Sequence, residues 1–192
     1  MTPDALFLLM TIAVICAFTP GPSTLMAATF AAQFGVRSTL PHVLGSGAGY
    51  AGIAACSGSL AGLLAAAPAL AAGLKGLGAA VLIGLAAKIA LGRGGSGRTA
   101  PCPPFSFVQS CLFQTANPKA WAACLAAASQ VPSAGLAVLA AVFFLALAAG
   151  VATWTILGGV LRGRLSDGPR QRRFNLTMGG SLAAVVLTGL AF

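Results

Sequence analysis

The amino-acid sequence predicts an all-α integral membrane protein with six transmembrane helices. Of its 192 residues, 58% are hydrophobic and 7% are charged, with a mean hydropathy of +0.93, whereas soluble domains contain about 25% charged residues. A membrane-spanning helix needs about 20 apolar residues, so a chain of this length holds about six spans. We therefore expect a single membrane domain over residues 1–192.

The first predicted span, Ala5–Phe34, contains the motif Thr19-Pro20-Gly21-Pro22-Ser23 near its middle. Proline lacks a backbone N–H and clashes with the preceding helical turn, so the two prolines should break the helix. Peptide groups freed in hydrocarbon are tolerated only where protein or a water-filled cavity satisfies them. We expect an interrupted helix of the kind that exposes backbone to a transported substrate, with a merely kinked packing helix as the alternative.

The remaining spans follow from apolar runs that are separated by turns and charged segments. A short turn is expected at 35–38, and a linker rich in glycine and proline at 93–104. The fourth span is broken again, by Asn117-Pro118-Lys119. The five spans are His42–Leu64, Leu70–Leu91, Ser106–Val131, Ala134–Leu161 and Phe174–Phe192.

Basic residues predict the orientation. If both termini lie outside the cytoplasm, nine basic residues face the cytoplasm, Lys75 faces outward and Lys119 lies within a span. The positive-inside rule favours this arrangement, with both termini periplasmic. The net charge of +9 therefore reflects topology rather than nucleic-acid binding. The nine residues are Arg37, Lys88, Arg93, Arg98, Arg162, Arg164, Arg170, Arg172 and Arg173.

The five cysteines form no CxxC pair and have no accompanying histidine cluster, so no metal site, cofactor or disulfide framework is expected. The simplest interpretation is that the cysteines serve as small buried apolar residues. They are Cys16, Cys56, Cys102, Cys111 and Cys124.

Two sequence similarities between the halves of the chain indicate an internal repeat. Residues 79–86 match residues 184–191 at six of eight positions, and Thr19–Pro22 aligns with Thr115–Pro118 when Pro22 is superposed on Pro118. Three spans per half would place the halves in opposite orientations. We expect two inverted three-helix repeats, at about 1–92 and 105–192, with their first helices broken at the same relative place. This pattern is typical of secondary transporters with a site at the repeat interface.

Several short motifs occur together in this chain: Pro20-Gly21-Pro22, the Gly35 turn with Arg37, Gly45 and Gly49, the Gly78-Ala79 start of the repeated motif, and Asn117-Pro118-Lys119. With this combination the chain resembles the LysE/RhtB family of small bacterial amino-acid exporters over nearly its whole length. The resemblance implies a proton-driven exporter of amino acids or close derivatives in the bacterial inner membrane. Lys88-Ile89-Ala90 and Gln114 are most similar to exporters of cysteine and O-acetylserine.

The chain departs from this family pattern at two positions. Many members carry Asn where this chain has Ser23, and lysine exporters carry an acid where it has Tyr50. No carboxylate lies within the predicted spans, and an unpaired buried charge costs several kcal/mol or more. We therefore expect a neutral amino acid rather than a dibasic one or a metal cation.

The expected substrate site lies at the two helix breaks. The substrate carboxylate would meet Lys119 and freed amides, and its ammonium would meet carbonyls released by Pro20, Pro22 and Pro118. Asn117, Thr19 and Thr115 could supply hydrogen bonds, and Tyr50 could close the pocket. The full predicted set is Thr19, Pro20, Gly21, Pro22, Ser23, Gly45, Gly49, Tyr50, Thr115, Asn117, Pro118 and Lys119.

Lys119 is the only charge expected in mid-membrane, where charged residues are functional by default, although it could instead bond exposed carbonyls for structure alone. Lys119 or His42 could carry the coupling proton, but His42 is more simply an interface residue with its polar end in water. Two other functions stay open: a transmembrane thiol conduit using Cys16 and Cys111, and a membrane subunit without transport. Neither an enzymatic activity nor nucleic-acid binding is expected. A homodimer is compatible with the small residues at four-residue spacing.

Overall fold

The chain is all-helical throughout the part that a computed structural model describes, which omits residues 93–102, 132–133, 166–167 and 192. The side chains of 58–65, 70–71, 74 and 189–191 are also outside the description. The eight helices are α1 (Pro3–Phe18), α2 (Pro22–Phe34), α3 (Val36–Ala66), α4 (Pro68–Ala90), α5 (Phe107–Thr115), α6 (Pro118–Gln130), α7 (Leu136–Arg162) and α8 (Gly168–Ala191). Part of the predicted linker, 93–102, therefore lies outside the described residues.

The predicted break in the first long helix is present and separates α1 from α2 with a bend of 44°. α1 ends at Phe18, and Gly21 is extended, with φ −165° and ψ 178°. Pro22 occupies the first position of α2, where its missing N–H costs nothing. Thr24 Oγ1 accepts from the Gly21 N–H at 2.8 Å and satisfies a donor at the start of the helix.

The second break separates α5 from α6 at Ala116 and Asn117. Asn117 is the N-cap of α6, and its Oδ1 accepts from the Lys119 N–H at 3.2 Å. Pro118 follows at the first helical position, as Pro22 does in α2. At the start of α5, Ser106 and Gln109 bond each other's backbone N–H reciprocally, at 3.2 and 2.9 Å.

The expected four-residue turn at 35–38 is wrong, because Gly35 alone joins α2 to α3. Its φ of +94° is open to glycine and strained for other residues, and it reverses the chain in one step. The Gly35 N–H still bonds Ala31 O at 2.9 Å, so α2 is closed before α3 begins at Val36. A Cβ at this position would also collide with the Arg162 guanidinium.

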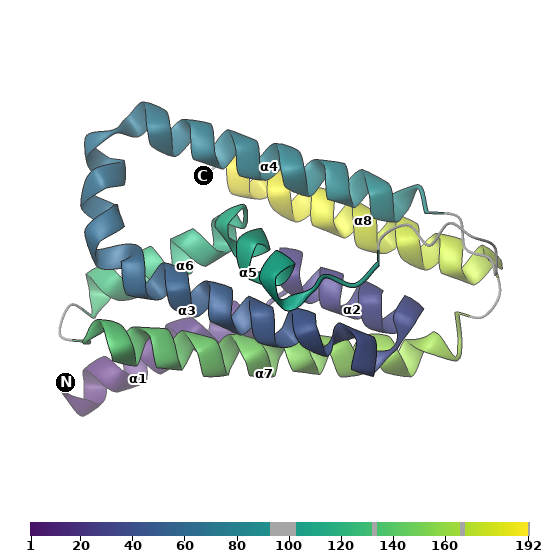
Figure 1. The fold of residues 1–192 in the computed structure, drawn as a ribbon, viewed down its shortest axis with the longest axis horizontal. Coiled ribbons are helices and arrows are strands. Elements are labelled where there is room, and N and C mark those ends of the chain that lie inside the picture. Colours follow the sequence, from purple (N-terminus) through teal and green to yellow (C-terminus); the bar gives the residue numbers. More distant parts are fainter. Residues whose placement is uncertain (93–102, 132–133, 166–167, 192) are drawn as a thin grey trace.

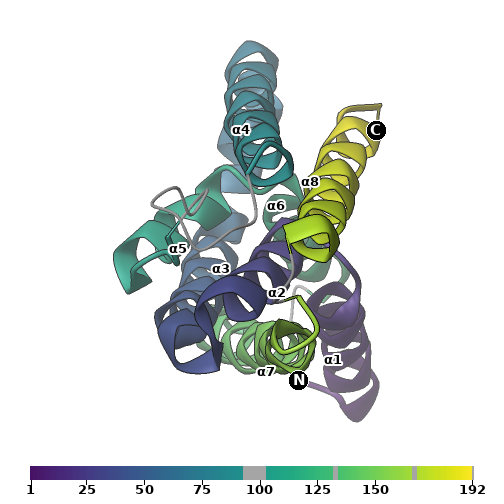
Figure 2. The same cartoon turned by 90° about the vertical axis from the view of Figure 1, so that its right-hand side faces the viewer.

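α2 lies at the centre of the helical assembly (Figure 2), and residues 22–32 are all buried. It packs on α7 and α3, and α8 covers part of it. α3 runs along α7, and α4 runs along α8, so the long helices form two pairs (Figure 1). α5 and α6 pack against α3. This arrangement brings the break between α1 and α2 to the break between α5 and α6.

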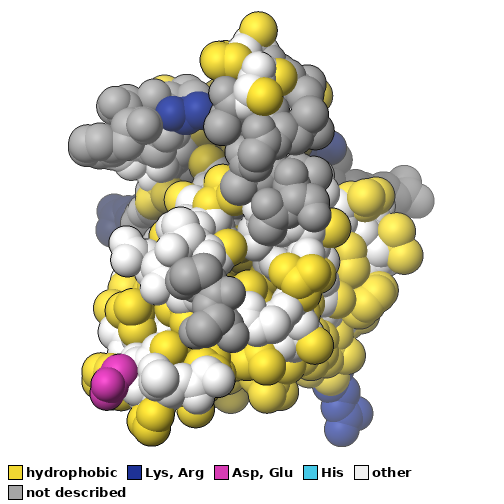
Figure 3. All heavy atoms as spheres, turned by 90° about the vertical axis from the view of Figure 1, so that its left-hand side faces the viewer, with side chains coloured by type: hydrophobic (Ala, Val, Ile, Leu, Met, Phe, Trp, Pro, Cys, Tyr) yellow, Lys and Arg dark blue, Asp and Glu magenta, His cyan; other side chains and the backbone are white. Residues whose placement is uncertain are grey.

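Apolar side chains cover much of the surface. Phe7, Leu77, Leu91, Leu145 and Val160 each expose two thirds or more of their area. In Figure 3, which views the left-hand end of Figure 1, hydrophobic side chains are widespread and the dark blue of Lys and Arg lies toward the margins. By length and hydropathy, α7 can cross a membrane, and the bent pair α1 and α2 is a second candidate within the described residues.

Candidate functional site

The two helix breaks meet through the Lys119 side chain. Its Nζ donates to the Thr19 carbonyl oxygen and to Thr19 Oγ1, both at 2.7 Å. The Thr19 hydroxyl can accept this bond because its own hydrogen is donated to Ile15 O at 2.7 Å. A Cβ at Gly21 would lie 2.9 Å from Lys119 Cδ. The absence of a side chain at Gly21 therefore lets the lysine cross from one break to the other.

A network of uncharged polar groups lies beside this contact, with Gln114 at its centre. Ser23 Oγ donates to Gln114 Oε1 at 2.8 Å, and Asn117 Nδ2 donates to the same oxygen at 3.0 Å. Gln114 Nε2 donates to Ser110 O at 3.1 Å and to Ser46 Oγ at 3.3 Å. The network thus joins α2, α3, α5 and the start of α6, and its five residues are all at most 4% exposed.

Tyr50 closes one side of the network. Its hydroxyl lies 3.5 Å from Asn117 Nδ2 and 3.8 Å from Cys16 Sγ, both long contacts. Its ring stacks on Phe143 with centroids 6.2 Å apart and an interplanar angle of 18°. At 1% exposure, Tyr50 is held by α1, α6 and α7 together. These contacts place Tyr50 beside the second break, and its role in closing a substrate pocket stays a prediction.

Other predicted site residues have different surroundings. Pro20 and Thr115 are exposed, and the Thr115 hydroxyl donates to Leu112 O within its own helix at 2.7 Å. Gly45 and Gly49 lie where α3 approaches α5: a Cβ at Gly49 would be 2.6 Å from Gln114 Cγ and 2.8 Å from Cys111 O. These two glycines permit close helix packing next to the network.

The interpretation of His42 as an interface residue is wrong, because its side chain is completely buried. Nδ1 lies 2.9 Å from Ser110 Oγ, and Nε2 lies 3.0 Å from the Ser23 carbonyl oxygen. The close fit of α3 against α2 and α5 encloses a residue only six positions from the start of α3. Sequence reasoning also missed Gln114, Ser46 and Ser110 as network members.

The cysteines differ among themselves. Cys16 and Cys124 are buried and belong to one apolar cluster with Tyr50, whereas Cys56 is exposed and Cys111 is partly exposed. The expectation of buried cysteines is therefore wrong for Cys56, while Cys102 lies outside the described residues. The thiols of Cys16, Cys56, Cys111 and Cys124 are free.

The site presents one cation among neutral hydrogen-bonding groups. Asp4, the one acid that the structure describes, lies in the first turn of α1, about 22 Å along the helix from Thr19 at 1.5 Å per residue. Every buried side-chain nitrogen or oxygen atom in the described chain has a hydrogen-bond partner. A ligand at the breaks would therefore have to replace existing bonds, above all those from Lys119 to Thr19.

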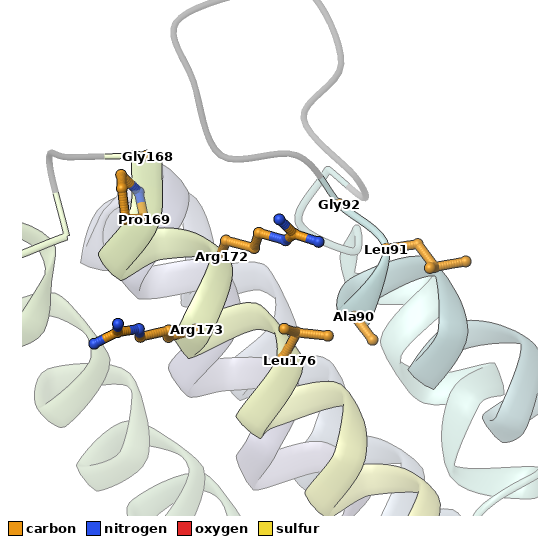
Figure 4. A pocket seen from close by; sticks show the side chains of 8 residues that line it. All are labelled: Ala90, Leu91, Gly92, Gly168, Pro169, Arg172, Arg173 and Leu176. Carbon is orange, nitrogen blue, oxygen red and sulfur yellow. The ribbon is translucent and has the colours of Figure 1, made fainter.

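A hollow of about 1080 Å³ lies elsewhere, between the end of α4 and the start of α8 (Figure 4). Arg172 points toward α4 there, and Arg173 points away from it. The hollow shares no residue with the network and borders the ends of 93–102 and 166–167, which lie outside the described residues. The candidate site is therefore the polar network at the helix breaks and not this hollow.

Comparisons with protein-family models, curated proteins and solved structures give no match for the chain.

Proposed function

We propose that the protein is a secondary exporter of neutral amino acids or close derivatives, of the LysE/RhtB type, embedded in the bacterial inner membrane. The observation that carries the proposal is the contact between the two helix breaks, where the Lys119 ammonium meets the Thr19 carbonyl beside a buried network of uncharged polar groups. A zwitterion can use both partners: its carboxylate would take the ammonium, and its own ammonium would take the carbonyl.

The distribution of polar and apolar groups supports a membrane location. Large apolar side chains are exposed on α1, α4, α5, α7 and α8, while the polar network is enclosed. Soluble monomers rarely expose apolar surface on this scale. α3, α4, α7 and α8 have 31, 23, 27 and 24 residues, which is at least about 35 Å of helix each and sufficient for a hydrocarbon core of about 30 Å. With two broken spans, these helices account for six crossings.

The packing pattern supports two inverted repeats. When α1, α2, α3 and α4 are exchanged with α5, α6, α7 and α8, most helix contacts map onto other contacts: α1 on α7 corresponds to α5 on α3, and α2 on α7 corresponds to α6 on α3. The pair α3 and α7 and the pair α4 and α8 map onto themselves. Such repeats commonly enclose a substrate between paired broken helices.

The charge distribution supports the orientation. The start of α3, the end of α4, the end of α7 and the start of α8 all lie at the right-hand end of Figure 1. These helix ends and the adjoining Arg164 carry seven of the eleven basic residues, whereas both chain termini lie toward the other end. The seven are Arg37, Lys88, Arg162, Arg164, Arg170, Arg172 and Arg173. The positive-inside rule would place the right-hand end in the cytoplasm.

Export of a defined solute tests the proposal. A strain that overproduces the protein is grown on inhibitory concentrations of single amino acids and analogues, and the compound against which it is protected is assayed by counterflow in proteoliposomes. Lys119→Ala should abolish counterflow, whereas Lys88→Ala, an exposed lysine of α4, should not. Size-exclusion chromatography in detergent checks that both variants fold. Unchanged counterflow in Lys119→Ala would show that Lys119 does not bind substrate and has only a structural role through its bonds to Thr19.

A further inference from the structure

His42 is the one histidine in the sequence, and its surroundings suit a group that gains and loses a proton inside the protein. We infer that its imidazole is the coupling-proton site of the transporter, with Ser110 as the positioning residue that accommodates both charge states. The link to transport rests on the proposed function, whereas the proton binding itself does not.

The hydrogen bonds assign the tautomer. Nε2 lies 3.0 Å from the Ser23 carbonyl oxygen, which can only accept, so Nε2 carries a hydrogen. In the neutral ring Nδ1 is then an acceptor, and its partner at 2.9 Å is Ser110 Oγ. Ser110 must therefore donate its single hydroxyl hydrogen to Nδ1 when the ring is neutral.

The same hydroxyl has a second acceptor. Ser110 Oγ lies 2.8 Å from Ser106 O, one turn earlier in α5. When Nδ1 is protonated, it donates to Ser110 Oγ, and the hydroxyl hydrogen turns to Ser106 O. Both charge states are then fully hydrogen-bonded, and the change between them is one hydroxyl rotation. These hydrogen bonds lower the cost of burying the imidazolium, although a buried charge without a counter-ion remains costly.

Three aromatic rings surround the imidazole. Its centroid lies 5.4, 5.9 and 6.3 Å from the ring centroids of Phe30, Phe105 and Phe113. All three pairs meet edge to face rather than stacked, so these contacts help to hold the imidazole in one orientation.

No charged side chain belongs to the described hydrogen-bond and ring partners of His42. α2 contains no titratable residue, and its contribution is the Ser23 carbonyl. The titratable residues of α3 and of the other helices packed on it are Arg37, Tyr50, Cys56, Lys75, Lys88, Cys111, Lys119, Cys124 and Arg162. Protonation of His42 therefore adds a charge that none of its described hydrogen-bond or ring partners neutralises.

Ser23 connects this charge to the substrate site. Its carbonyl accepts from His42 Nε2, and its hydroxyl donates to Gln114 Oε1, which also binds Asn117 beside Lys119. The proton itself comes from water and adds to the Nδ1 lone pair, and its release reverses that step. His42 lies six residues into α3, about 9 Å from the start of that helix, which lies at the end of the molecule that carries most of the basic residues. In this conformation the exchange is with water at that end, past the exposed N-terminal turn of α5. Coupling to a gradient requires exchange with water on the opposite side in the other conformation of the transporter.

Nitrogen NMR of the imidazole tests proton binding without transport. Because the sequence has one histidine, labelling with ¹⁵N-histidine and purifying through a tag without histidine gives a single ring to follow. The expected spectrum is the Nε2–H tautomer at high pH, with Nδ1 becoming protonated reversibly as the pH falls while the protein stays folded. Ser110→Ala should lower the proton affinity of Nδ1 about tenfold. Ser57→Ala, which removes a buried hydroxyl whose described hydrogen bond goes to Ala54 O in the same helix, should leave it unchanged.

An imidazole that stays neutral down to the pH of unfolding, an Nδ1–H tautomer, or equal titrations for Ser110→Ala and Ser57→Ala would overturn the assignment. Transport supplies the second test. His42→Gln keeps a donor and an acceptor but takes no proton, so it should retain counterflow at equal pH and lose accumulation driven by a pH gradient. Gradient-driven accumulation in this variant would remove His42 from coupling. Absence of counterflow in the wild type would instead overturn the proposed function.

Discussion

The close approach of α3 to α5 leads to a quantitative prediction for Gly49→Ala. An added Cβ would lie 2.6 Å from Gln114 Cγ and 2.8 Å from Cys111 O. Separations below 3.0 Å force movement, and the Cys111 oxygen is backbone, so α5 must shift. Overpacking of this kind costs about 1–3 kcal/mol, while replacing glycine by alanine within a helix contributes about 1 kcal/mol of stabilisation.

Gly52→Ala is the matched control, because it lies three residues later in the same helix and its added Cβ would meet nothing within 4 Å. The helix-propensity gain is common to both variants, so their difference in free energy of unfolding isolates overpacking. We expect Gly49→Ala to be about 1–3 kcal/mol less stable than Gly52→Ala in reversible unfolding in mixed micelles, followed by circular dichroism. Equal stabilities would refute the packing assigned to Gly49.

Three further predictions address the cap, the core and the orientation. Asn117→Ala removes the N-cap of α6 and a donor to Gln114, so it should lower the free energy of unfolding by about 2–3 kcal/mol. Thr2→Ala removes only the exposed cap of α1 and should cost about 1 kcal/mol. Equal losses for the two variants in chemical unfolding would contradict the role of Asn117 in the network. Phe143→Ala, at a fully buried residue that stacks on Tyr50, should cost about 3–5 kcal/mol in the same assay, whereas Leu145→Ala, 67% exposed, should cost under about 0.5 kcal/mol. A C-terminal alkaline phosphatase fusion should be active and a C-terminal green fluorescent protein fusion dark, with the opposite result for fusions after Gly163; the reverse pattern would invert the proposed orientation.

The helix breaks could be predicted from sequence because their cause is local. Pro22 and Pro118 each lack an N–H and fix their own φ, which suits the first helical position that both occupy. Proline alone does not decide the break, because Pro41 lies inside α3. The length of the turn at Gly35 was predicted wrongly. A glycine followed by polar residues is compatible both with a one-residue turn of positive φ and with a longer turn. The number of membrane crossings stays a prediction.

The polar network depended on tertiary packing and was only partly predicted. Gln109 and Gln114 belong to the same short helix, yet Gln109 is exposed and caps Ser106 while Gln114 is buried at the network centre. Nothing in the neighbouring residues separates them, because helices that are apolar on every face carry little information about which side turns inward. His42 was misplaced for the same reason. One signal was available: Ser110 and Gln114 are four residues apart in α5, so they lie on one face of that helix, and Asn117 follows at the break.

The bond between Lys119 and Thr19 also has an electrical direction. Thr19 follows the last turn of α1, where the helix dipole is negative, whereas Lys119 lies in the first turn of α6, where the dipole of its own helix is positive. The ammonium is therefore repelled by the helix that carries it and attracted by the helix in the other half of the chain. Under the proposed function, a zwitterion that replaced this bond would keep the same order of charges, and it would separate Lys119 Nζ from the Thr19 carbonyl oxygen by the length of one amino-acid backbone.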